Sequence, residues 1–447
     1  MDNYKLFIPS AGLGTRLGHL SNNINKALVT IDNKPVISHV IEKFSPDIEI
    51  VIALGFKGDL VRDYLNLAHP ERNFVFVFID KFEGPESGLG YSILQCRQYL
   101  QCPFIFCPND TIIIENIDPP TKNWIGYADL ENNNNYRSLK IDEYGLVQKI
   151  YEKSEVYDPE SKPYTGLFGV KSYNQFWNVM EQGKKYGSIK IGESYAIREF
   201  IKNNIPIEAK KVSWLDTGTP DRLKKSREIL RSESSPEILE KENESIWFVG
   251  DQVIKYNRDK NFILDRVERS KILNGYVPPV LAYNENMYSY RFIEGSILSK
   301  INTPLIFSKF LKYLKGFWNP YTLDEKESKE FKQACYQFYK KKTEKRVKLY
   351  FDKMSEIDTP SIINDENIPT VSDLLDKIDW NWLSTGNPTR VHGDLHFENT
   401  VLAENGEFYL LDWRQNFGGI KEYGDVYYDL AKILHGLEVS HELINKN

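Results

Sequence analysis

Residues 391–399 near the C-terminus, VHGDLHFEN, restrict what this chain can be more than any other stretch. Asn399 follows Asp394 by five residues, and Asp412 ends an apolar run at 408–411. Phosphoryl transfer from ATP needs a carboxylate that orients and deprotonates an alcohol, and hard oxygen ligands that hold Mg²⁺ against the phosphates. Asp394 suits the first task, and Asn399 and Asp412 suit the second. The alternative is an acidic strand–loop–strand hairpin without catalysis, but three role-matched residues in the right order favour phosphoryl transfer.

The spacing around Asp394 matches the H-x-D-x-x-x-x-N catalytic loop of kinases, with Asp412 in the place of the D-F-G aspartate. Residues 423–431, YGDVYYDLA, stand where a protein kinase would carry its A-P-E segment. Together these motifs resemble the aminoglycoside phosphotransferase and choline kinase superfamily over residues 244–447. The resemblance implies a two-lobed, kinase-like α+β domain that phosphorylates a small molecule with ATP and Mg²⁺. The resemblance implies that Asp394 is the catalytic base and that Asn399 and Asp412 bind the metal ion.

The start of this half departs in part from the kinase pattern. Residues 245–256, SIWFVGDQVIKY, predict a hairpin around Gly250 without a clear glycine-rich loop before it. By resemblance, Lys255 binds the ATP phosphates, and Glu268, on a helix predicted over 265–273, pairs with it. A solvated surface lysine is the alternative for Lys255. Residues 303–383 are expected to be mainly helical, with the basic run 340–348 as a solvated helix face.

The other end of the chain carries a second phosphate-binding pattern. Residues 4–9 predict a buried strand, the loop 10–17 reads SAGLGTRL, and helical periodicity follows over 35–44. A strand, a glycine loop and a helix in this order present backbone N–H groups to phosphate. Gly12 and Gly14 allow close approach of the backbone. Arg16 and Lys26 supply charge that can neutralise a triphosphate.

This pattern resembles the nucleoside-triphosphate transferase family, which includes the sugar-1-phosphate nucleotidyltransferases, over residues 1–230. The resemblance implies a doubly wound, Rossmann-like α/β domain with Arg16 and Lys26 as catalytic residues. The backbone contacts to the nucleotide would come from Ala11, Gly12, Gly14 and Thr15. Binding of another dinucleotide is the alternative, but a ribose-binding acid is missing from the expected place.

Alternating strands and helices support that fold class. Strands at 49–54 and 74–79 flank a helix at 59–67, which predicts a mostly parallel, doubly wound sheet. A second glycine-rich loop follows, and by resemblance its Gly88 and Gly90 contact the nucleobase. A plain helix-entry turn is the alternative for this loop.

Two distant carboxylates form the predicted metal site of this half. Asp110 follows a buried strand at 104–107, and ligands of open α/β sheets bind at the carboxyl ends of strands. Asp216 lies in the segment 214–220, WLDTGTP. Together they can hold one Mg²⁺ between the α-phosphate and the attacking phosphate. Asp110 matches the metal-binding aspartate of the family, although Asn109 replaces its usual glycine. Either aspartate alone could cap a turn.

The family resemblance also indicates a substrate-binding subregion between these aspartates. Lys153 stands where the family has the lysine that meets the sugar phosphate, although Ser154 replaces a proline there. Gly166 matches the position where the backbone contacts the sugar. Glu193 could accept hydrogen bonds from substrate hydroxyls, and a solvated surface glutamate is the alternative.

Length and composition fit two soluble domains. We expect a nucleotidyltransferase domain at 1–230, a charged, serine-rich linker at 231–244, and a phosphotransferase domain at 245–447. Only eighteen residues follow Asp429, fewer than the superfamily usually has, so C-terminal truncation of the second domain stays open. The net charge of −6 gives no general attraction to nucleic acid or to anionic membranes. Without a signal-peptide pattern or a long apolar run, we expect a cytoplasmic protein, and a homo-oligomer stays open.

The two halves suggest consecutive reactions, because the product of a kinase is the substrate of a nucleotidyltransferase. We expect a bifunctional enzyme that phosphorylates a sugar or other small alcohol with ATP and couples the product to CTP or UTP. The activated compound would serve a surface polysaccharide, either capsule or lipopolysaccharide. One alternative is a choline kinase fused to a CTP:phosphocholine cytidylyltransferase, which would need an aromatic cage. Another is an active nucleotidyltransferase beside a non-catalytic, kinase-like binding module.

Overall fold

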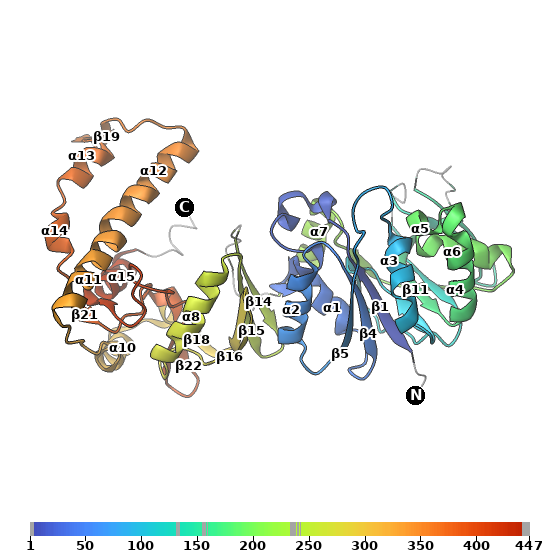
Figure 1. Ribbon diagram of the computed structural model, residues 1–447, viewed down its shortest axis with the longest axis horizontal. Coiled ribbons are helices and arrows are strands. Elements are labelled where there is room, and N and C mark those ends of the chain that lie inside the picture. The colour runs from blue at the N-terminus through green and yellow to red at the C-terminus, as the bar shows by residue number, and fades with distance from the viewer. Residues whose placement is uncertain are drawn as a thin grey trace. The chain divides into compact units, whose positions relative to one another are not determined.

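The computed structural model describes residues 4–130, 135–153, 158, 160–232, 238, 241 and 243–439. Ser154, much of the predicted linker and the last residues from 440 onward lie outside this part of the chain. The chain divides into two compact units, Met1–Arg258 and Asp259–Asn447, which we call the N-terminal and the C-terminal unit. Figure 1 shows both along the colour ramp.

The N-terminal unit is built on a mixed, mostly parallel sheet. Its central path runs in the order β10-β9-β11-β6-β1-β4-β5. The strands of this path are β1 (Lys5–Ser10), β4 (Glu49–Leu54), β5 (Asn73–Phe78), β6 (Phe104–Phe106), β9 (Ser138–Ile141), β10 (Val147–Tyr151) and β11 (Lys162–Val170). The strands β6, β1, β4 and β5 pair in parallel, and β5, β4 and β1 lie side by side in Figure 1. Buried apolar runs in β1 and β4 are typical of strands that are covered on both faces, so the predicted doubly wound α/β fold is confirmed.

Amphipathic helices cover this sheet. In α2 (Gly58–Ala68), the residues Val61, Tyr64, Leu65 and Ala68 share the buried face with the spacing of an α-helix. The other helices of the unit are α1 (Val36–Ile41), α3 (Leu89–Gln95), α4 (Tyr173–Gln182), α5 (Ser188–Ile191), α6 (Glu193–Lys202) and α7 (Pro220–Leu230).

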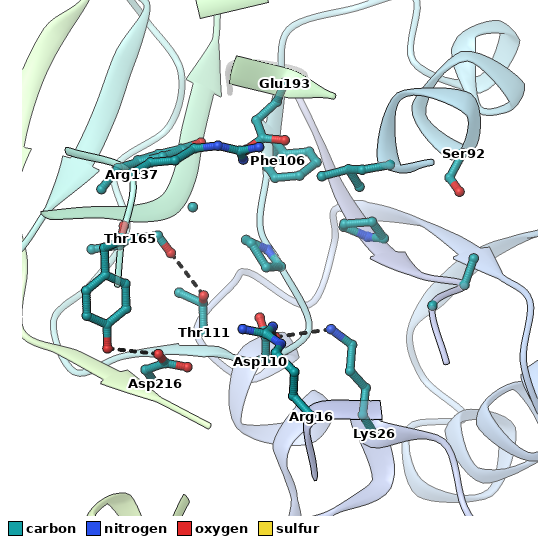
Figure 2. A pocket seen from close by; sticks show the side chains of 18 of the residues that line it. Arg16, Lys26, Ser92, Phe106, Asp110, Thr111, Arg137, Thr165, Glu193 and Asp216 are labelled. Atoms are coloured by element: carbon teal, nitrogen blue, oxygen red, sulfur yellow. Dashed lines mark hydrogen bonds and ion pairs between the residues drawn. The ribbon is translucent and has the colours of Figure 1, made fainter. Parts of the chain in front are cut away.

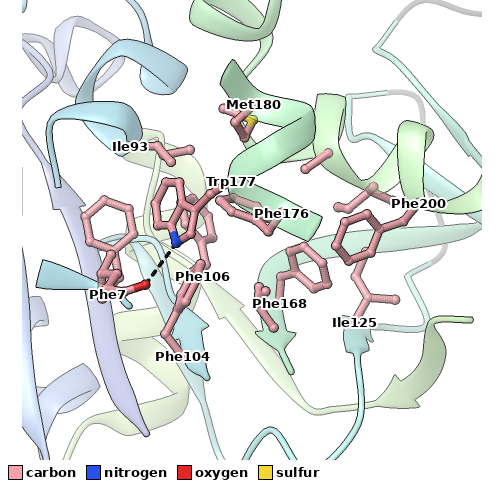
Figure 3. Close-up of a cluster of buried hydrophobic side chains, with 14 of the residues drawn as sticks. Phe7, Ile93, Phe104, Phe106, Ile125, Phe168, Phe176, Trp177, Met180 and Phe200 are labelled. Carbon is pink, nitrogen blue, oxygen red and sulfur yellow. Dashed lines mark hydrogen bonds between the residues drawn. The ribbon is translucent and has the colours of Figure 1, made fainter. Parts of the chain in front are cut away.

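An aromatic core lies beneath α4, as Figure 3 shows. The Phe104 ring stacks on the Trp177 ring at 5.7 Å between centroids, and Phe176 meets Trp177 edge-on at 4.9 Å. Trp177 Nε1 donates a hydrogen bond of 2.9 Å to the carbonyl of Leu100. Because Phe104 begins β6, this packing fixes the strand whose carboxyl end leads to Asp110.

The hairpin of β14 (Glu244–Val249) and β15 (Gln252–Asn257) belongs to the N-terminal unit. Its Trp247 is fully buried, with the Tyr64 ring at 5.0 Å and the Tyr256 ring at 5.8 Å. The N–H of Phe248 donates to the carbonyl of Asn33 at 3.0 Å. The hairpin itself agrees with the sequence prediction. The division of the chain at 258/259 differs from the predicted boundary at 244/245, because these aromatic contacts join the hairpin to α2.

The C-terminal unit combines small sheets with helices. Its strands include β16 (Val280–Tyr283), β17 (Met287–Arg291), β18 (Gly295–Ile297), β22 (Thr400–Ala403) and β23 (Phe408–Leu410). Its longer helices are α8 (Lys260–Ile272), α10 (Pro304–Phe317), α11 (Glu325–Tyr336), α12 (Lys342–Met354) and α15 (Val426–Glu438). Sequence signals set several ends: Asp324 and Glu327 form a capping box at the start of α11, and Asp425 caps α15. The segment 303–383 is mainly helical as predicted, with an added hairpin of β19 (Ser361–Ile363) and β20 (Glu366–Ile368).

The basic run 340–348 is only partly the solvated face that the sequence predicts. Lys345, Arg346 and Lys348 are exposed, but the ammonium of Lys342 is buried. A π-helical turn, η5 (Gln337–Lys341), joins α11 to α12 immediately before Lys342. Such turns shift the register of a helix, so the periodicity of the sequence assigned Lys342 to the wrong side. Within the described residues, no helix is long and apolar enough to cross a membrane.

Replacing Trp247 with alanine should destabilise the N-terminal unit by about 3–5 kcal/mol, the usual cost of emptying a buried aromatic site. The matched control is Trp382→Ala, since Trp382 is 71% exposed and should change stability by no more than about 0.5 kcal/mol. Urea unfolding of the full chain measures both. Equal effects of the two substitutions would contradict the packing of the hairpin on α2.

Candidate active sites

A cavity of about 410 Å³ opens at the carboxyl ends of β1 and β6. It gathers most of the site residues predicted in this unit. Those that line it are Ala11, Gly12, Arg16, Lys26, Gly88, Asp110, Lys153, Gly166, Glu193 and Asp216. Gly14, Thr15 and Gly90 do not line it. Figure 2 shows two ends, with Arg16, Lys26, Asp110 and Asp216 at one and Arg137 and Glu193 at the other.

The loop after β1 is held by asparagines that the sequence did not single out. The amide of Asn25 donates to the carbonyls of Ser10 at 3.2 Å and Phe56 at 2.6 Å. The buried amide of Asn109 donates to Ser10 Oγ at 2.6 Å, so the residue that replaces the family's glycine has a structural task. Gly14 has a φ of 71°, and a Cβ there would lie 3.0 Å from Lys26 Cβ. Gly14 therefore shapes the loop from behind the cavity.

Asp110 is surrounded by the two predicted catalytic cations. Lys26 Nζ lies 3.1 Å from Asp110 Oδ2, and the Arg16 guanidinium lies 3.7 Å from the same oxygen. Burial alone would raise the pKa of this carboxyl, but the neighbouring cations outweigh it and hold the pKa below its ordinary value. Asp110 is therefore ionised at neutral pH.

Asp216 is brought to Asp110 by strand pairing. β13 (Trp214–Asp216) pairs antiparallel with β7 (Thr111–Ile113), and Asp216 stands opposite Thr111. A Cβ built on Gly218 would lie 3.1 Å from Asp216 Oδ1 and 3.4 Å from Asp110 Oδ2, so both carboxylates face one small space. Two carboxylates with room for substrate phosphates suit Mg²⁺, which binds few protein ligands. No group of three or more His, Cys, Asp or Glu side chains suited to a metal occurs among the described residues.

Asp216 has further partners that sequence reasoning missed. Tyr136 donates to Asp216 Oδ2 at 3.0 Å, and Arg222 donates to the same oxygen at 2.6 Å. The Arg222 guanidinium lies 4.2 Å from the centre of the Tyr136 ring, which in turn meets Trp214 at 4.9 Å. These side chains orient Asp216 and form one wall of the cavity.

The opposite end of the cavity is organised around a buried glutamate. Glu193 is 2% exposed, so the alternative of a solvated surface residue is wrong. Burial raises the pKa of Glu193, although Arg137 counteracts this from 3.2 Å. Glu193 Oε2 has no hydrogen-bond partner within the described chain, so this oxygen is available to a ligand. Arg137 also donates to Glu152 at 2.8 Å and was not predicted.

Lys153 lines the cavity, and its side chain is exposed. Partial desolvation lowers the pKa of its ammonium, and the charges of Arg16, Arg137 and Arg222 lower it further. Several positive side chains therefore converge on one part of the cavity. An anionic group of a substrate would relieve their mutual repulsion. The phosphate contact of Lys153 stays a prediction.

Gly88 and Gly90, the two predicted contacts of the second glycine-rich loop, have different surroundings. Gly88 lines the cavity, whereas Gly90 does not. A Cβ on Gly90 would collide with the carbonyl of Ser188, so this glycine allows α3 to pack against α5. Gly166 has a φ of 91° and lines the cavity, and a Cβ there would lie 2.6 Å from the ring of Pro108.

The HGD loop of the C-terminal unit is anchored by buried groups. Asp429 on α15 accepts hydrogen bonds of 2.8 Å from the backbone N–H groups of both His392 and Gly393. Arg269 on α8 donates to four carbonyls around the loop, those of Val391, His392, Arg414 and Lys421. Burial and the charge of Arg269 lower the pKa of His392 to about 3, so its imidazole is neutral. The histidine of the motif is thus part of the support for Asp394.

Asp394, Asn399 and Asp412 are brought together as predicted. Asn399 Nδ2 donates to the carbonyl of Asp394 at 2.9 Å, and the N–H of Leu411 donates to the carbonyl of Asn399 at 2.7 Å. Asp412 follows with a φ of 58°, which is uncommon for a residue other than glycine and frequent at functional sites. Its carboxylate pairs with Arg266 at 3.0 Å. The oxygens of Asn399 and Asp412 suit Mg²⁺ by their chemistry.

The two predicted ATP-binding charges behave differently. Lys255 is only 6% exposed, so a solvated surface lysine is excluded. Glu268 forms an ion pair with Lys421, which also binds Asp265 at 2.7 Å. The pairing of Glu268 with Lys255 stays a prediction. The ion pair with Lys421 was not predicted, because Lys421 lies far from Glu268 in the sequence.

Both halves of the chain are similar to known proteins. Residues 354–443 match the phosphotransferase enzyme family, APH. The bifunctional protein GlmU of Methanocaldococcus jannaschii is 23% identical over 253 residues, which are 55% of this chain and 59% of GlmU. UTP–glucose-1-phosphate uridylyltransferase AglF of Haloferax volcanii is 22% identical over 241 residues, which are 51% of this chain and 96% of AglF. The chain thus spans little more than half the length of the GlmU relative.

Among solved structures, the CTP:phosphocholine cytidylyltransferase LicC of Streptococcus pneumoniae is 22% identical, with a TM-score of 0.44 over 51% of this chain and all of LicC. The chain carries a nucleotidyltransferase-like N-terminal region and a C-terminal phosphotransferase region, as the sequence motifs predict.

Replacing Arg137 with methionine should lower the free energy of unfolding by about 3–5 kcal/mol, because it leaves Glu193 as a buried charge without a partner. The loss should be small near pH 5 and grow toward pH 8. The substitution raises the pKa of Glu193 in the folded chain further. Stability therefore falls as the pH rises above the pKa that Glu193 has in the unfolded chain. Chemical unfolding at several pH values measures this.

Arg198→Met is the matched control, since Arg198 pairs with Glu152 at 2.6 Å but does not touch Glu193. It should cost no more than about 1 kcal/mol. The double variant Arg137→Met/Glu193→Gln should recover most of the lost stability. A loss that is the same at pH 5 and pH 8, or that the second substitution leaves unchanged, would contradict the account.

Proposed function

We propose that this chain makes a nucleotide-activated compound in two steps. The C-terminal unit phosphorylates a sugar or other small alcohol with ATP, and the N-terminal unit couples the product to an NTP with release of pyrophosphate. The observation that carries the proposal is the convergence of Asp110, Asp216, Arg16 and Lys26 at one end of the cavity. The activated compound would feed a surface polysaccharide, either capsule or lipopolysaccharide.

In the transfer step, a phosphate oxygen of the substrate attacks the α-phosphorus of the NTP, and the bond to the β-phosphate breaks. Arg16 and Lys26 would stabilise the negative charge that develops on the phosphates. Lys153 and Arg222 would bind the attacking phosphate from the other side. Asp110 and Asp216 would hold Mg²⁺, which when bound neutralises phosphate charge. Ala11, Gly12 and Gly88 would contact the nucleotide, for which CTP or UTP is expected.

In the kinase step, the acceptor hydroxyl gives its proton to Asp394, and its oxygen forms a bond to the γ-phosphorus of ATP while ADP leaves. Lys432 lies 2.9 Å from Asp394 and helps to keep the pKa of this carboxyl low, so the base is ionised at neutral pH. Asn399 and Asp412 would hold the metal ion.

A sugar fits the N-terminal cavity better than choline does. Glu193 Oε2 offers a buried acceptor that suits hydroxyl groups, and Gly166 exposes backbone beside it. A quaternary ammonium needs free aromatic faces, and at one aromatic residue of the lining, Tyr136, the Arg222 guanidinium already lies 4.2 Å from the ring centre. A choline kinase joined to a phosphocholine cytidylyltransferase therefore stays the second candidate.

Substitutions should separate the two steps in the full chain. Asp394→Asn should lower ATP-dependent phosphorylation by about 10²–10⁴-fold, the usual contribution of a general base, because the amide cannot accept the proton. It should leave pyrophosphate release from a pre-phosphorylated substrate unchanged. Lys26→Met should do the reverse and slow pyrophosphate release by about 100-fold or more.

Asp352→Asn is a surface control, since Asp352 is exposed and pairs with Lys348 on the same helix. Unchanged phosphorylation in Asp394→Asn would exclude Asp394 as the base and favour a non-catalytic binding module. If Lys26→Met slowed both steps equally, the assignment of one step to each unit would fail.

A further inference from the structure

An aromatic cluster lies next to the HGD loop in the C-terminal unit. The Phe338 ring stacks on Phe417 at 4.2 Å and meets the Tyr428 ring edge-on at 4.7 Å. Phe338 comes from the π-helical turn η5, and Tyr428 comes from α15. Neither the transfer step nor the kinase step uses these rings.

Cations from separate segments surround this cluster. Lys342 Nζ lies 3.4 Å from the centre of the Phe338 ring and 5.1 Å from that of Tyr428. The Arg414 guanidinium lies 5.0 Å from the Phe338 ring, and Lys432 Nζ lies 5.9 Å from the Tyr428 ring. These side chains come from α12, from the loop after β23 and from α15. The Phe338 and Tyr428 rings therefore both have cations of the chain itself over them.

The same cations border the catalytic base. Lys432 Nζ forms an ion pair with Asp394 Oδ1 at 2.9 Å. Arg414 Nε donates to the carbonyl of Gly393 at 3.1 Å, immediately before Asp394. Gly393 has a φ of 85°, and a Cβ there would lie 2.8 Å from Arg414 Cβ, so Arg414 packs closely on the loop. An acceptor whose hydroxyl meets Asp394 must therefore lie beside Lys432 and Arg414.

The positive charge here is not balanced within the described chain. Lys342 Nζ is shielded from solvent and has no hydrogen-bond partner there, and neither Lys342 nor Arg414 has an ion pair with a described carboxylate. Of the nearby acids, Asp394 is taken by Lys432, and Glu398 pairs with His396 at 2.8 Å. A buried ammonium without a partner is costly. Burial and the charges of Arg414, Arg346 and Lys432 lower the pKa of Lys342 to about 7, which reflects that cost.

We propose that the acceptor of the C-terminal unit is an anionic hydroxy compound, whose carboxylate or phosphate group is bound by Lys342, Arg414 and Lys432 while its hydroxyl meets Asp394. This rests on the kinase step proposed above and narrows its substrate class. The anionic group supplies the acceptors that the Lys342 ammonium lacks. Cationic acceptors such as choline are disfavoured, since cations of the chain already lie over the Phe338 and Tyr428 rings and the local charge repels a further cation. The transfer itself is unchanged: the hydroxyl oxygen gains the γ-phosphoryl group, ADP leaves, and the proton goes to Asp394.

The first test is binding of small probes to the full chain by calorimetry. Glycerate and glycerol 3-phosphate are the anionic probes, and glycerol and choline are the neutral and cationic controls. At least one anionic probe should bind about tenfold or more tightly than glycerol, the usual gain from a charge-assisted hydrogen bond. The two anionic probes distinguish a carboxylate site from a phosphate site. Binding of glycerol or choline as tight as that of both anions would overturn the proposal.

Lys342→Met should weaken binding of the preferred anion by about tenfold or more and at the same time raise the melting temperature, because it removes a buried charge without a partner. Lys345→Met is the matched control on the same helix, since Lys345 is exposed. It should change neither quantity. Unchanged anion binding in Lys342→Met would overturn the proposal, whatever happens to the melting temperature.

ATP consumption then separates this inference from the kinase proposal. The panel is glucuronate and glucose 6-phosphate against glucose and choline. Turnover of an anionic acceptor that Asp394→Asn abolishes supports both claims. If glucose or choline is turned over at an equal or higher rate, and Asp394→Asn abolishes this turnover, the proposed kinase step stands and the proposal of an anionic acceptor is overturned. If anion binding depends on Lys342 but Asp394→Asn leaves ATP turnover unchanged, the anion site stands and the proposed kinase step is overturned.

Discussion

The pairing of β13 with β7 is the interaction on which the N-terminal site depends. It sets Asp216 opposite Thr111, and both the N–H and the hydroxyl of Thr217 donate to the carbonyl of Asp110, at 3.1 and 3.2 Å. A carboxylate at the end of a central parallel strand thereby gains a second carboxylate from far along the chain. Tyr136 and Arg222 both donate hydrogen bonds to Asp216. This short antiparallel pair therefore places the second carboxylate beside the first and positions the wall next to them.

Each site contains buried polar atoms without a hydrogen-bond partner in the described part of the chain. In the N-terminal cavity these include the acceptor Glu193 Oε2, together with Tyr164 Oη and Trp214 Nε1. Near Asp394 they include the Lys342 ammonium and His392 Nε2. A buried polar group is stable only when it is paired, so each leftover group describes what its ligand should carry. Under our proposals, hydroxyl groups would satisfy Glu193 and an anionic group would satisfy Lys342. A sugar acid or a sugar phosphate contains both.

Local sequence patterns predicted the fold and the loops well, because those depend on neighbouring residues. The apolar runs of β1 and β4, the glycine loop with Arg16 and Lys26, and the order of Asp394, Asn399 and Asp412 all follow from short-range spacing. Glu193 could not be placed, since its burial depends on Arg137, which lies far away in the sequence. The pairing of Glu268 with Lys421 and the inward position of Lys342 after a π-helical turn were missed for the same kind of reason. Spacing assigns a residue to a face of a helix, but it does not show which distant charge or ring meets that face.

The central claim is that the two units act consecutively on one compound, and the transfer of label from ATP tests it most directly. The full chain would receive ATP labelled in its γ-phosphate, unlabelled CTP or UTP, and an unphosphorylated acceptor from the sugar and sugar-acid classes. Consecutive action predicts that the label appears first in the phosphorylated acceptor and then in the nucleotide-linked product, and never in pyrophosphate. A nucleotide-linked product without label, or pyrophosphate release from the unphosphorylated acceptor at the same rate without ATP, would contradict the account.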